Sequence, residues 1–311
     1  MFEKVLPNKK IYIAGCGGML GDAFYKEFKS EYNLKCSDIN TNEDWISFLD
    51  FRDFKSYKNE VIEFSPDYLF HLGAYTDLEY CEKNHHDTYV TNTKSVEYAL
   101  TIAKELNIPL LFISTAGIFD GKKDVYDESD MPNPMGHYAK SKFLAEKYLM
   151  ENSKHYLICR AGWMMGGGPT KDKKFIYKLI KQIENGVSEL NIVNDKLGTP
   201  TYTHDFARNV KLLIQKGKSG LYNMVCQGVT SRLDVAHELL KQLDLKNKIK
   251  ITEVSSDFFK KEFFAPRPPS ERLINARLEK EGLSIMRNWE DSLKEYIEIS
   301  YNENFKLFSS K

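Results

Sequence analysis

Residues 11–21 read IYIAGCGGMLG, a short apolar run that enters a cluster of glycines. Apolar residues then recur at helical spacing through residues 19–28, so the segment predicts a strand, a tight turn and a helix. Glycine lets a backbone approach a ligand closely, and a helix start offers unpaired N–H groups and a positive dipole end to phosphate. The positions predicted to hold a dinucleotide are Gly15, Gly18, Met19, Leu20 and Gly21. Their GxxGxxG spacing differs from the commoner GxGxxG, and a glycine-rich turn without a ligand is the alternative.

The rest of the first half alternates short apolar runs with stretches of helical periodicity. We expect further strands at residues 34–37, 67–72, 110–114 and 156–160, and further helices at residues 87–106 and 138–150. Repeated βαβ units predict an α/β fold, a Rossmann-like doubly wound parallel sheet with helices on both faces.

After Trp163 the pattern changes to a loop rich in glycine and lysine. We expect residues 1–165 to form a dinucleotide-binding domain. Residues 166–311 would form mainly a smaller C-terminal substrate-binding lobe, with part of residues 203–243 returning to the first domain. Helices are expected in this second half at residues 175–184, from Ser231 onward and at residues 289–299.

The 311 residues carry 44 Lys+Arg and 44 Asp+Glu, so the formal net charge is zero. No global field therefore attracts nucleic acid or anionic lipid, and a small molecule is the expected partner. Five scattered cysteines without CxxC spacing predict neither a disulfide framework nor a zinc site, and no metal is expected. No apolar run is long enough for export or for a membrane span, so we expect a cytoplasmic protein. Whether the chain forms a homodimer is left open.

Acidic residues beside the second strand concern the choice of cofactor. Asp38 ends that strand, where its carboxylate can accept hydrogen bonds from an adenosine ribose and would repel a 2′-phosphate. This favours NAD(H) over NADP(H), and an aspartate that only caps a turn is the alternative. Asp50 and Phe51 follow the next helical stretch and would meet the adenine, unless they lie in a solvated loop.

A second decisive segment is YAKSK at residues 138–142. Tyr138 and Lys142 are four residues apart and share one face of a predicted helix. A tyrosine with an ordinary pKa near 10 is a poor proton-transfer group at neutral pH, and a nearby ammonium favours its phenolate. The pair therefore predicts proton transfer assisted by Lys142. The YxxxK pattern is common, so an exposed pair on an amphipathic helix is the alternative.

Hydroxyl groups favour the catalytic interpretation of that pair. The strand at residues 110–114 leads into Ser114 and Thr115, at the carboxyl edge of the predicted sheet, where ligands bind in such folds. Thr115 can hydrogen-bond a substrate carbonyl, and a hydroxyl that only caps the strand end is the alternative.

The glycine turn, the hydroxyl after the fourth strand and the YxxxK pattern together resemble the extended short-chain dehydrogenase/reductase family. Further segments resemble its dTDP-4-dehydrorhamnose reductase-like branch over essentially the whole chain: Gly73–Asp77 with Cys81-Glu82, Ser114–Gly121, Arg160–Trp163, Gly198–Thr201, and Arg267–Ser270 with Leu273. The resemblance implies NAD(P)H-dependent reduction of the keto group of a nucleotide-linked 4-keto-6-deoxy sugar, in deoxysugar and cell-surface polysaccharide biosynthesis.

The resemblance also implies roles for individual residues. Thr115 would orient the carbonyl, Tyr138 would donate the proton, and Lys142 would bind the cofactor ribose and adjust the pKa of Tyr138. Ala74 would lie near the cofactor. The residues expected at the substrate are Thr76, Thr115, Trp163, Thr201 and Arg267.

Ala116, Gly117 and Asn275 depart from the branch, which usually has aspartate and tyrosine at the first two positions and commonly aspartate at the third. These positions are expected to flank the sugar, so its identity stays open. Two other functions also stay open. One is a nucleotide-sugar epimerase or dehydratase that keeps NAD bound, and the other is a non-catalytic NAD(P)-binding regulatory subunit, as one relative is for methionine adenosyltransferase.

Three further features are assigned to structure rather than chemistry. His85 and His86 lack a third ligand at regular spacing and are expected at a solvated helix start. Residues 171–174 are expected as a solvated lysine loop, and the phenylalanine pairs 258–259 and 263–264 are expected in the core.

Overall fold

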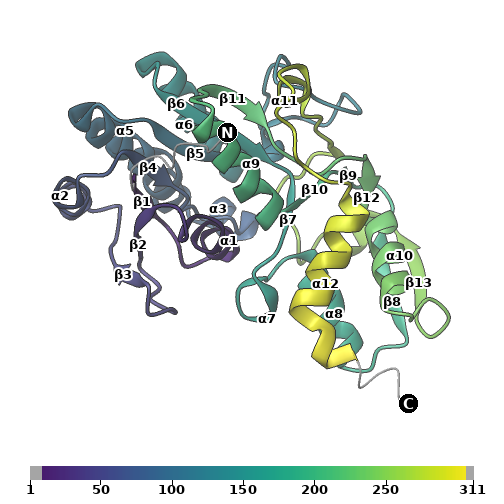
Figure 1. The fold of residues 1–311 in the computed structure, drawn as a ribbon. Coiled ribbons are helices and arrows are strands. Elements are labelled where there is room, and N and C mark those ends of the chain that lie inside the picture. Colours follow the sequence, from purple (N-terminus) through teal and green to yellow (C-terminus); the bar gives the residue numbers. More distant parts are fainter. Residues whose placement is uncertain (1–8, 306–311) are drawn as a thin grey trace.

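The computed structural model describes residues 9–305. Its centre is a sheet of seven strands in the spatial order β11-β6-β5-β4-β1-β2-β3 (Figure 1). The strands are β1 (Lys10–Ala14), β2 (Asn33–Asp38), β3 (Ile46–Phe48), β4 (Tyr68–His71), β5 (Leu110–Thr115), β6 (Tyr156–Ala161) and β11 (Gly220–Asn223). All neighbouring strands in this sheet pair in parallel. The order runs outward from β1 in both directions, which is the doubly wound arrangement predicted from the sequence.

Helices cover both faces of the sheet. Along β1, Ile11 and Ile13 belong to one hydrophobic cluster, whereas Tyr12 and Ala14 belong to another. This alternation shows that both faces of the strand are buried. The first cluster is covered by α1 (Met19–Phe28) and α9 (Thr203–Gln215), and the second by α2 (Phe54–Phe64), α5 (Ser95–Leu106) and α6 (His137–Asn152).

A second lobe follows β6 and contains three longer helices with several short strands (Figure 1). Its helices are α7 (Gly168–Lys171), α8 (Phe175–Glu184), α10 (Arg232–Gln242) and α12 (Trp289–Phe305). Its strands are β7 (Trp163–Met165), β8 (Glu189–Val193), β9 (Leu197–Gly198), β10 (Pro200–Tyr202), β12 (Thr230–Ser231), β13 (Lys250–Val254) and β14 (Ser270–Glu271). The strand pairs are β7 with β10, β8 with β13, and β9 with both β12 and β14.

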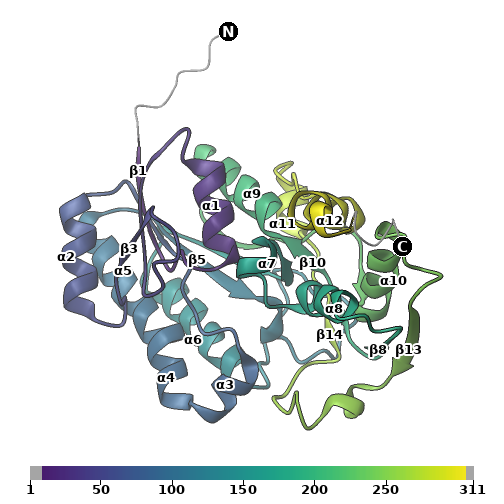
Figure 2. The same cartoon turned by 90° about the horizontal axis from the view of Figure 1, so that it is seen from below.

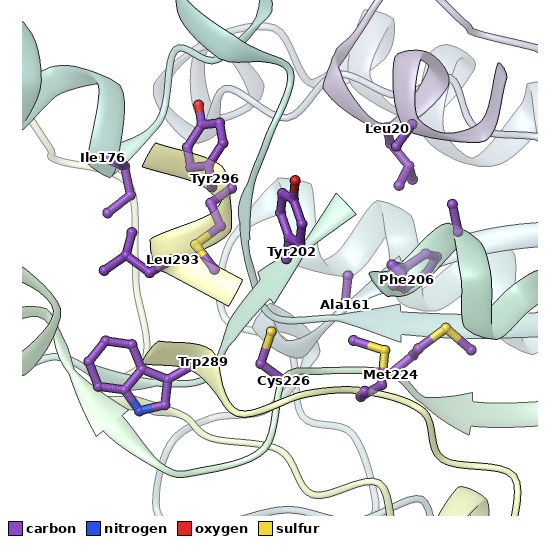
Figure 3. Packing of buried hydrophobic residues seen from close by; sticks show 14 of the residues in the cluster. Leu20, Ala161, Ile176, Tyr202, Phe206, Met224, Cys226, Trp289, Leu293 and Tyr296 are labelled. Carbon is purple, nitrogen blue, oxygen red and sulfur yellow. The ribbon is translucent and has the colours of Figure 1, made fainter. Parts of the chain in front are cut away.

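One hydrophobic core runs through both lobes. Figure 3 shows Leu20 of α1 and Phe206 of α9 in the same cluster as Tyr202 of β10 and Tyr296 of α12. Three elements from the second half of the chain belong to the first lobe. β11 pairs with β6, α9 packs against α1, and α11 (Ala276–Lys280) packs against β11. The two lobes therefore share one hydrophobic core.

The helix expected at residues 87–106 is interrupted. The chain forms α4 (His85–Tyr89), a π-helical turn η1 (Val90–Lys94) and then α5. Asn92 lies in that turn, where its side chain accepts a hydrogen bond from the Tyr75 N–H at 2.7 Å and donates one to the Tyr75 carbonyl at 3.0 Å. The π turn thus directs a buried amide toward the loop after β4, which is a common use of such turns near functional sites.

Two expectations about the second half are wrong. The phenylalanine pairs are not in the core, since Phe258 is 60% and Phe264 43% exposed in the segment that follows β13. The loop after Trp163 includes the short helix α7. The five cysteines are free and buried. Within residues 9–305, no helix combines the length and the apolar character needed to cross a bilayer.

Candidate active site

The predicted cofactor residues follow neighbouring strands of the sheet. The glycine turn follows β1, Asp38 ends β2, Asp50 and Phe51 follow β3, Ala74 follows β4, and Thr115 ends β5. Because these strands are parallel and adjacent, all of these positions share the carboxyl edge of the sheet. The fold therefore brings together residues that are widely separated in the sequence.

The glycine turn combines two crowded positions with one open position. A Cβ at Gly15 would lie 2.2 Å from the Gly73 nitrogen, and a Cβ at Gly21 would lie 2.2 Å from the Cys16 carbonyl oxygen. At Gly18 a Cβ would meet no atom within 4 Å. Gly18 is the N-cap of α1 and supplies no side-chain cap. The N–H groups of the first turn of α1 are therefore available to a phosphate.

Met19 and Leu20, the first two residues of α1, have only part of their atoms available for contact with a cofactor. Leu20 is buried in the core, so only its backbone can reach a cofactor. Met19 lies against the loop of the second lobe, where a Cβ on Gly167 would be 2.7 Å from the Met19 Cβ. Met19 thus marks the place where the second lobe approaches the glycine turn.

Asp38 is fixed by two backbone N–H groups. Its Oδ2 accepts from Gly17 at 2.9 Å, and its Oδ1 accepts from Asn40 at 2.8 Å. A carboxylate held beside the glycine turn suits hydrogen bonds from ribose hydroxyls, and its negative charge would oppose a 2′-phosphate.

Asp50 and Phe51 are engaged with other protein groups. Hydrogen bonds from the Arg52 guanidinium, at 2.9 Å from Nε and 2.7 Å from Nη2, lower the pKa of Asp50. Phe51 is only 9% exposed and packs against Gly73, with its ring centre 4.8 Å from that of His71. Asp50 therefore belongs to an ion pair. Phe51 is a core residue that shapes the loop after β4, and a solvated-loop position for it is excluded.

Tyr138 and Thr115 meet at the end of β5. Tyr138 lies in the first turn of α6, and burial raises its pKa to about 12, although a hydrogen bond with the Thr115 side chain opposes this shift. The Thr115 Oγ1 also accepts from the Gly117 N–H at 3.1 Å. The two groups expected to handle a carbonyl oxygen are therefore neighbours, where α6 packs against the end of β5.

Lys142 lies one helical turn further along α6, in an environment that the sequence did not indicate. It is 3% exposed, and its ammonium lies 4.1 Å from the centre of the Phe112 ring. Burial lowers the pKa of Lys142 to about 7, against the effect of the Glu146 carboxylate. The expected lowering of the Tyr138 pKa by Lys142 is not found, because burial of the phenol dominates.

Several groups at this edge fit a dinucleotide cofactor. The Ser114 hydroxyl is buried and has no hydrogen-bond partner among residues 9–305, which costs roughly 1–3 kcal/mol unless a ligand supplies one. Within the same described residues the Lys142 ammonium makes no hydrogen bond. The Ser114 hydroxyl and the Lys142 ammonium therefore remain as hydrogen-bond donors for a nicotinamide dinucleotide, and the open space at Gly18 leaves room for it.

Trp163 forms one wall of the site with two residues that the sequence analysis missed. Its Nε1 donates to the Glu271 Oε2 at 2.8 Å. The Arg232 guanidinium lies 3.7 Å from the centre of the Trp163 ring and 4.6 Å from that of Phe175. Burial lowers the pKa of Arg232 to about 10. The sequence did carry one signal for Arg232, which is the first residue of α10. A helix start disfavours a cation, so an arginine at that position is unusual.

Two residues expected at the substrate, Thr76 and Arg267, also join the lobes. The Lys174 Nζ donates to the Thr76 Oγ1 at 3.0 Å, and Arg267 binds both carboxylate oxygens of Glu79 at 2.7 and 2.8 Å. Lys171 pairs with Glu43 at 2.9 Å. The expectation of a solvated lysine loop is therefore wrong, because both lysines are held by the first lobe.

Thr201 and Asn275 are both buried. Thr201 is 0% exposed, and its hydroxyl accepts from the Gly162 N–H at 2.9 Å, so it ties β10 to the chain before β7. The Asn275 amide accepts from the Val225 N–H at 2.9 Å and donates to the Val225 carbonyl at 2.7 Å. The polar groups of both residues bind the backbone, and their predicted sugar contacts stay predictions.

Known proteins are similar to this chain in sequence and fold. A family model described as the RmlD substrate binding domain matches residues 9–302. This chain belongs to that family. Spore coat polysaccharide biosynthesis protein SpsK of Bacillus subtilis is 27% identical, over 93% of this chain and 97% of its own length. Methionine adenosyltransferase 2 subunit beta of Danio rerio is 24% identical, over 91% of this chain and 88% of its own length.

A solved structure agrees with the fold of this RmlD-type chain. The dTDP-4-dehydrorhamnose reductase of Bacillus anthracis, in complex with NADP, is 25% identical and superimposes with a TM-score of 0.84 over 93% of this chain and 99% of that chain. The predicted resemblance to the dTDP-4-dehydrorhamnose reductase-like branch and the predicted Rossmann-like fold are both confirmed.

Proposed function

We propose that this chain reduces the keto group of a nucleotide-linked 4-keto-6-deoxy sugar with NAD(P)H, in deoxysugar and cell-surface polysaccharide biosynthesis. The observation that carries the proposal is the position of Tyr138, in the first turn of α6, beside Thr115 at the same sheet edge as the glycine turn. The family match and the dTDP-4-dehydrorhamnose reductases among the relatives support the substrate class.

In the proposed reaction, Tyr138 and Thr115 hold the carbonyl oxygen of the substrate. When bound, the nicotinamide supplies a hydride to the carbonyl carbon. Tyr138 gives its proton to the oxygen, so an alcohol forms, and the phenolate regains a proton from solvent. The raised pKa keeps Tyr138 protonated at neutral pH, which is the form that a proton donor requires. The Thr115 hydroxyl stabilises the negative charge that develops on the oxygen.

We propose that Lys142 and Asp38 hold the two riboses of the cofactor. The Lys142 ammonium is buried without a hydrogen-bond partner in the described part of the chain, and it can donate to hydroxyls of the nicotinamide ribose. Asp38 would accept hydrogen bonds from the adenosine ribose. Because its fixed carboxylate opposes a 2′-phosphate, we propose that NADH is preferred to NADPH.

We propose that Arg232 binds the diphosphate of the substrate. Its guanidinium lies against the rings of Trp163 and Phe175 and hydrogen-bonds no residue in the range 9–305. The planar fork of arginine fits phosphate oxygens, and a partly desolvated guanidinium gains most from such a contact. This differs from the sequence-based expectation for Arg267, whose N–H groups already bind Glu79.

The proposal is tested by mixing the purified protein with NADH or NADPH and a panel of dTDP-linked and UDP-linked 4-keto-6-deoxy sugars. Net loss of the absorbance of the reduced nicotinamide, with one alcohol formed per cofactor oxidised, is the expected result. An epimerase or dehydratase would convert the sugar without net cofactor consumption, and that outcome would replace the proposal.

The match to methionine adenosyltransferase 2 subunit beta favours a second candidate, a non-catalytic regulatory subunit. That function predicts a stable complex with a methionine adenosyltransferase catalytic chain and no oxidation of NADH by any sugar of the panel. Gel filtration of the mixed chains distinguishes the two functions. Light scattering in the same run measures whether the chain forms a homodimer, which is open. The cytoplasmic location stays a prediction.

A further inference from the structure

Three potential metal ligands meet beside the start of the helix that carries Tyr138. Glu82 comes from α3 (Leu78–Lys83), His85 begins α4, and His137 is the first residue of α6. One ligand atom from each side chain lies within 4.8 Å of the others. The two imidazole rings are stacked with their centres 3.5 Å apart and their planes 15° apart. Figure 2 shows α3, α4 and α6 side by side.

Each of these three side chains is fixed through one polar atom and keeps a second one free. The Glu82 Oε1 accepts from the His137 N–H at 2.5 Å. The His85 Nε2 bonds the Glu82 backbone carbonyl at 2.8 Å, and the His137 Nδ1 bonds the Tyr89 hydroxyl at 3.3 Å. Within residues 9–305 the Glu82 Oε2, the His85 Nδ1 and the His137 Nε2 then have no hydrogen-bond partner.

This pattern is the one that prepares a side chain for metal binding. A carbonyl can only accept, so the His85 Nε2 must carry the proton, and its Nδ1 must present a lone pair. Ligating histidines in metal sites typically use their second nitrogen in this way, because the hydrogen bond fixes the tautomer and the ring orientation. The carboxylate of Glu82 is held by a backbone N–H and still presents one oxygen.

The charges around the cluster are also compatible with a cation. The charged groups nearest to His137 are the Glu82 carboxylate and the Lys140 ammonium. The start of α6 opposes a cation, and the negative charge of Glu82 offsets that effect.

We propose that Glu82, His85 and His137 bind a divalent transition-metal ion of the zinc class, with water completing its coordination. Two imidazoles and one carboxylate are a donor set that Zn²⁺ uses, whereas Mg²⁺ and Ca²⁺ select oxygen ligands. Zinc–ligand distances of about 2.0–2.2 Å require the exposed His85 ring to tilt out of the stack. Such an ion would tie the end of α3 and the start of α4 to the residue before Tyr138.

The sequence analysis dismissed His85 and His86 because no third ligand was apparent. The missing ligands are Glu82, one helical turn earlier, and His137, which only the fold brings near. This site is separate from the glycine turn and from Arg232, so its existence does not depend on the proposed reductase activity.

The experiment is isothermal titration of the chelator-treated full chain with ZnCl₂ or MgCl₂, combined with thermal unfolding in zinc and in chelator. We expect the wild type to bind one Zn²⁺ per chain and to melt at a higher temperature with zinc. Glu82→Gln keeps the oxygen that caps α6, and His85→Ala changes an exposed residue, so both variants should fold. Each should lose at least about tenfold in zinc affinity, since even second-shell substitutions cost that much.

The matched control is His86→Ala, which alters the exposed neighbour of His85 outside the cluster. It should bind zinc as the wild type does. Absence of zinc binding in the wild type, equal zinc affinity in His85→Ala and wild type, or an equal response to Mg²⁺ would each overturn the proposal.

Discussion

Replacement of Lys142 by methionine should stabilise the protein. Lys142 is 3% exposed, and burial lowers its pKa from 10.5 to about 7. One pKa unit corresponds to about 1.4 kcal/mol, so burial of the charged form costs up to about 5 kcal/mol. A volume-conserving change to an uncharged side chain costs less than about 1.5 kcal/mol in packing. We therefore expect the free energy of unfolding to rise by about 3 kcal/mol below the folded-state pKa.

The gain should depend on pH in a defined direction. Between pH of about 7 and 10.5, the unfolded chain binds a proton at Lys142 that the folded chain does not bind. The stability of the wild type therefore rises with pH across this window. The advantage of Lys142→Met is complete below the window and shrinks by about 1.4 kcal/mol per pH unit within it.

Urea unfolding of both proteins at about pH 6 and about pH 9, followed by tryptophan fluorescence, measures this effect. Lys140→Met is the matched control, because Lys140 is exposed on the same helix and should show no pH-dependent gain. Equal stability of Lys142→Met and wild type at both pH values would refute the reasoning, since the buried ammonium would then carry no desolvation cost.

Three further predictions concern the cofactor, the substrate and the core. Asp38→Ser removes a charge that repels the 2′-phosphate of NADPH, so the ratio of kcat/KM for NADPH to kcat/KM for NADH should rise at least about tenfold. An unchanged ratio in steady-state assays would contradict the assignment of Asp38 to the ribose. Arg232→Met should raise KM for the nucleotide sugar about 10-fold or more while KM for NADH stays constant, because charge-assisted hydrogen bonds contribute about 1.5–3 kcal/mol; unchanged binding of the sugar would exclude the contact. Glu146→Gln should lower the free energy of unfolding by about 3–5 kcal/mol, because the buried Arg160, whose Nη2 lies 2.7 Å from the Glu146 Oε2, loses its charged partner. A loss below about 1 kcal/mol in urea unfolding would show that this ion pair does not stabilise the fold.

The overall fold could be predicted because its evidence is local. The glycine turn and the alternation of apolar runs with helical periods each reside in short segments, and right-handed parallel crossovers follow from them. β3 and β11 were not recognised. β3 has three residues, and β11 reads GLYN, so only pairing with β2 and β6 makes them strands. The π turn was also hidden, because it depends on contacts between Asn92 and the distant Tyr75.

The same distinction applies to the site. Asp38 and Thr115 could be placed because a parallel sheet collects the ends of its strands at one edge, whereas Ala74 was implied only by the family resemblance. The contacts of Arg267 and Thr201 could not be predicted, since their partners Glu79 and Gly162 come from other segments of the chain. Desolvation likewise reversed the expected direction of the Tyr138 pKa, and no spacing in the sequence reports desolvation.

The central claim is that Tyr138 donates a proton to a carbonyl oxygen held by Thr115. The most direct measurement is NADH oxidation by Tyr138→Phe with the preferred keto-sugar, alongside the Kd of NADH from fluorescence titration. We predict that turnover falls at least about 100-fold while the Kd of NADH stays unchanged, because a positioned acid contributes about that much. Retention of more than about a tenth of wild-type turnover would contradict the assigned role.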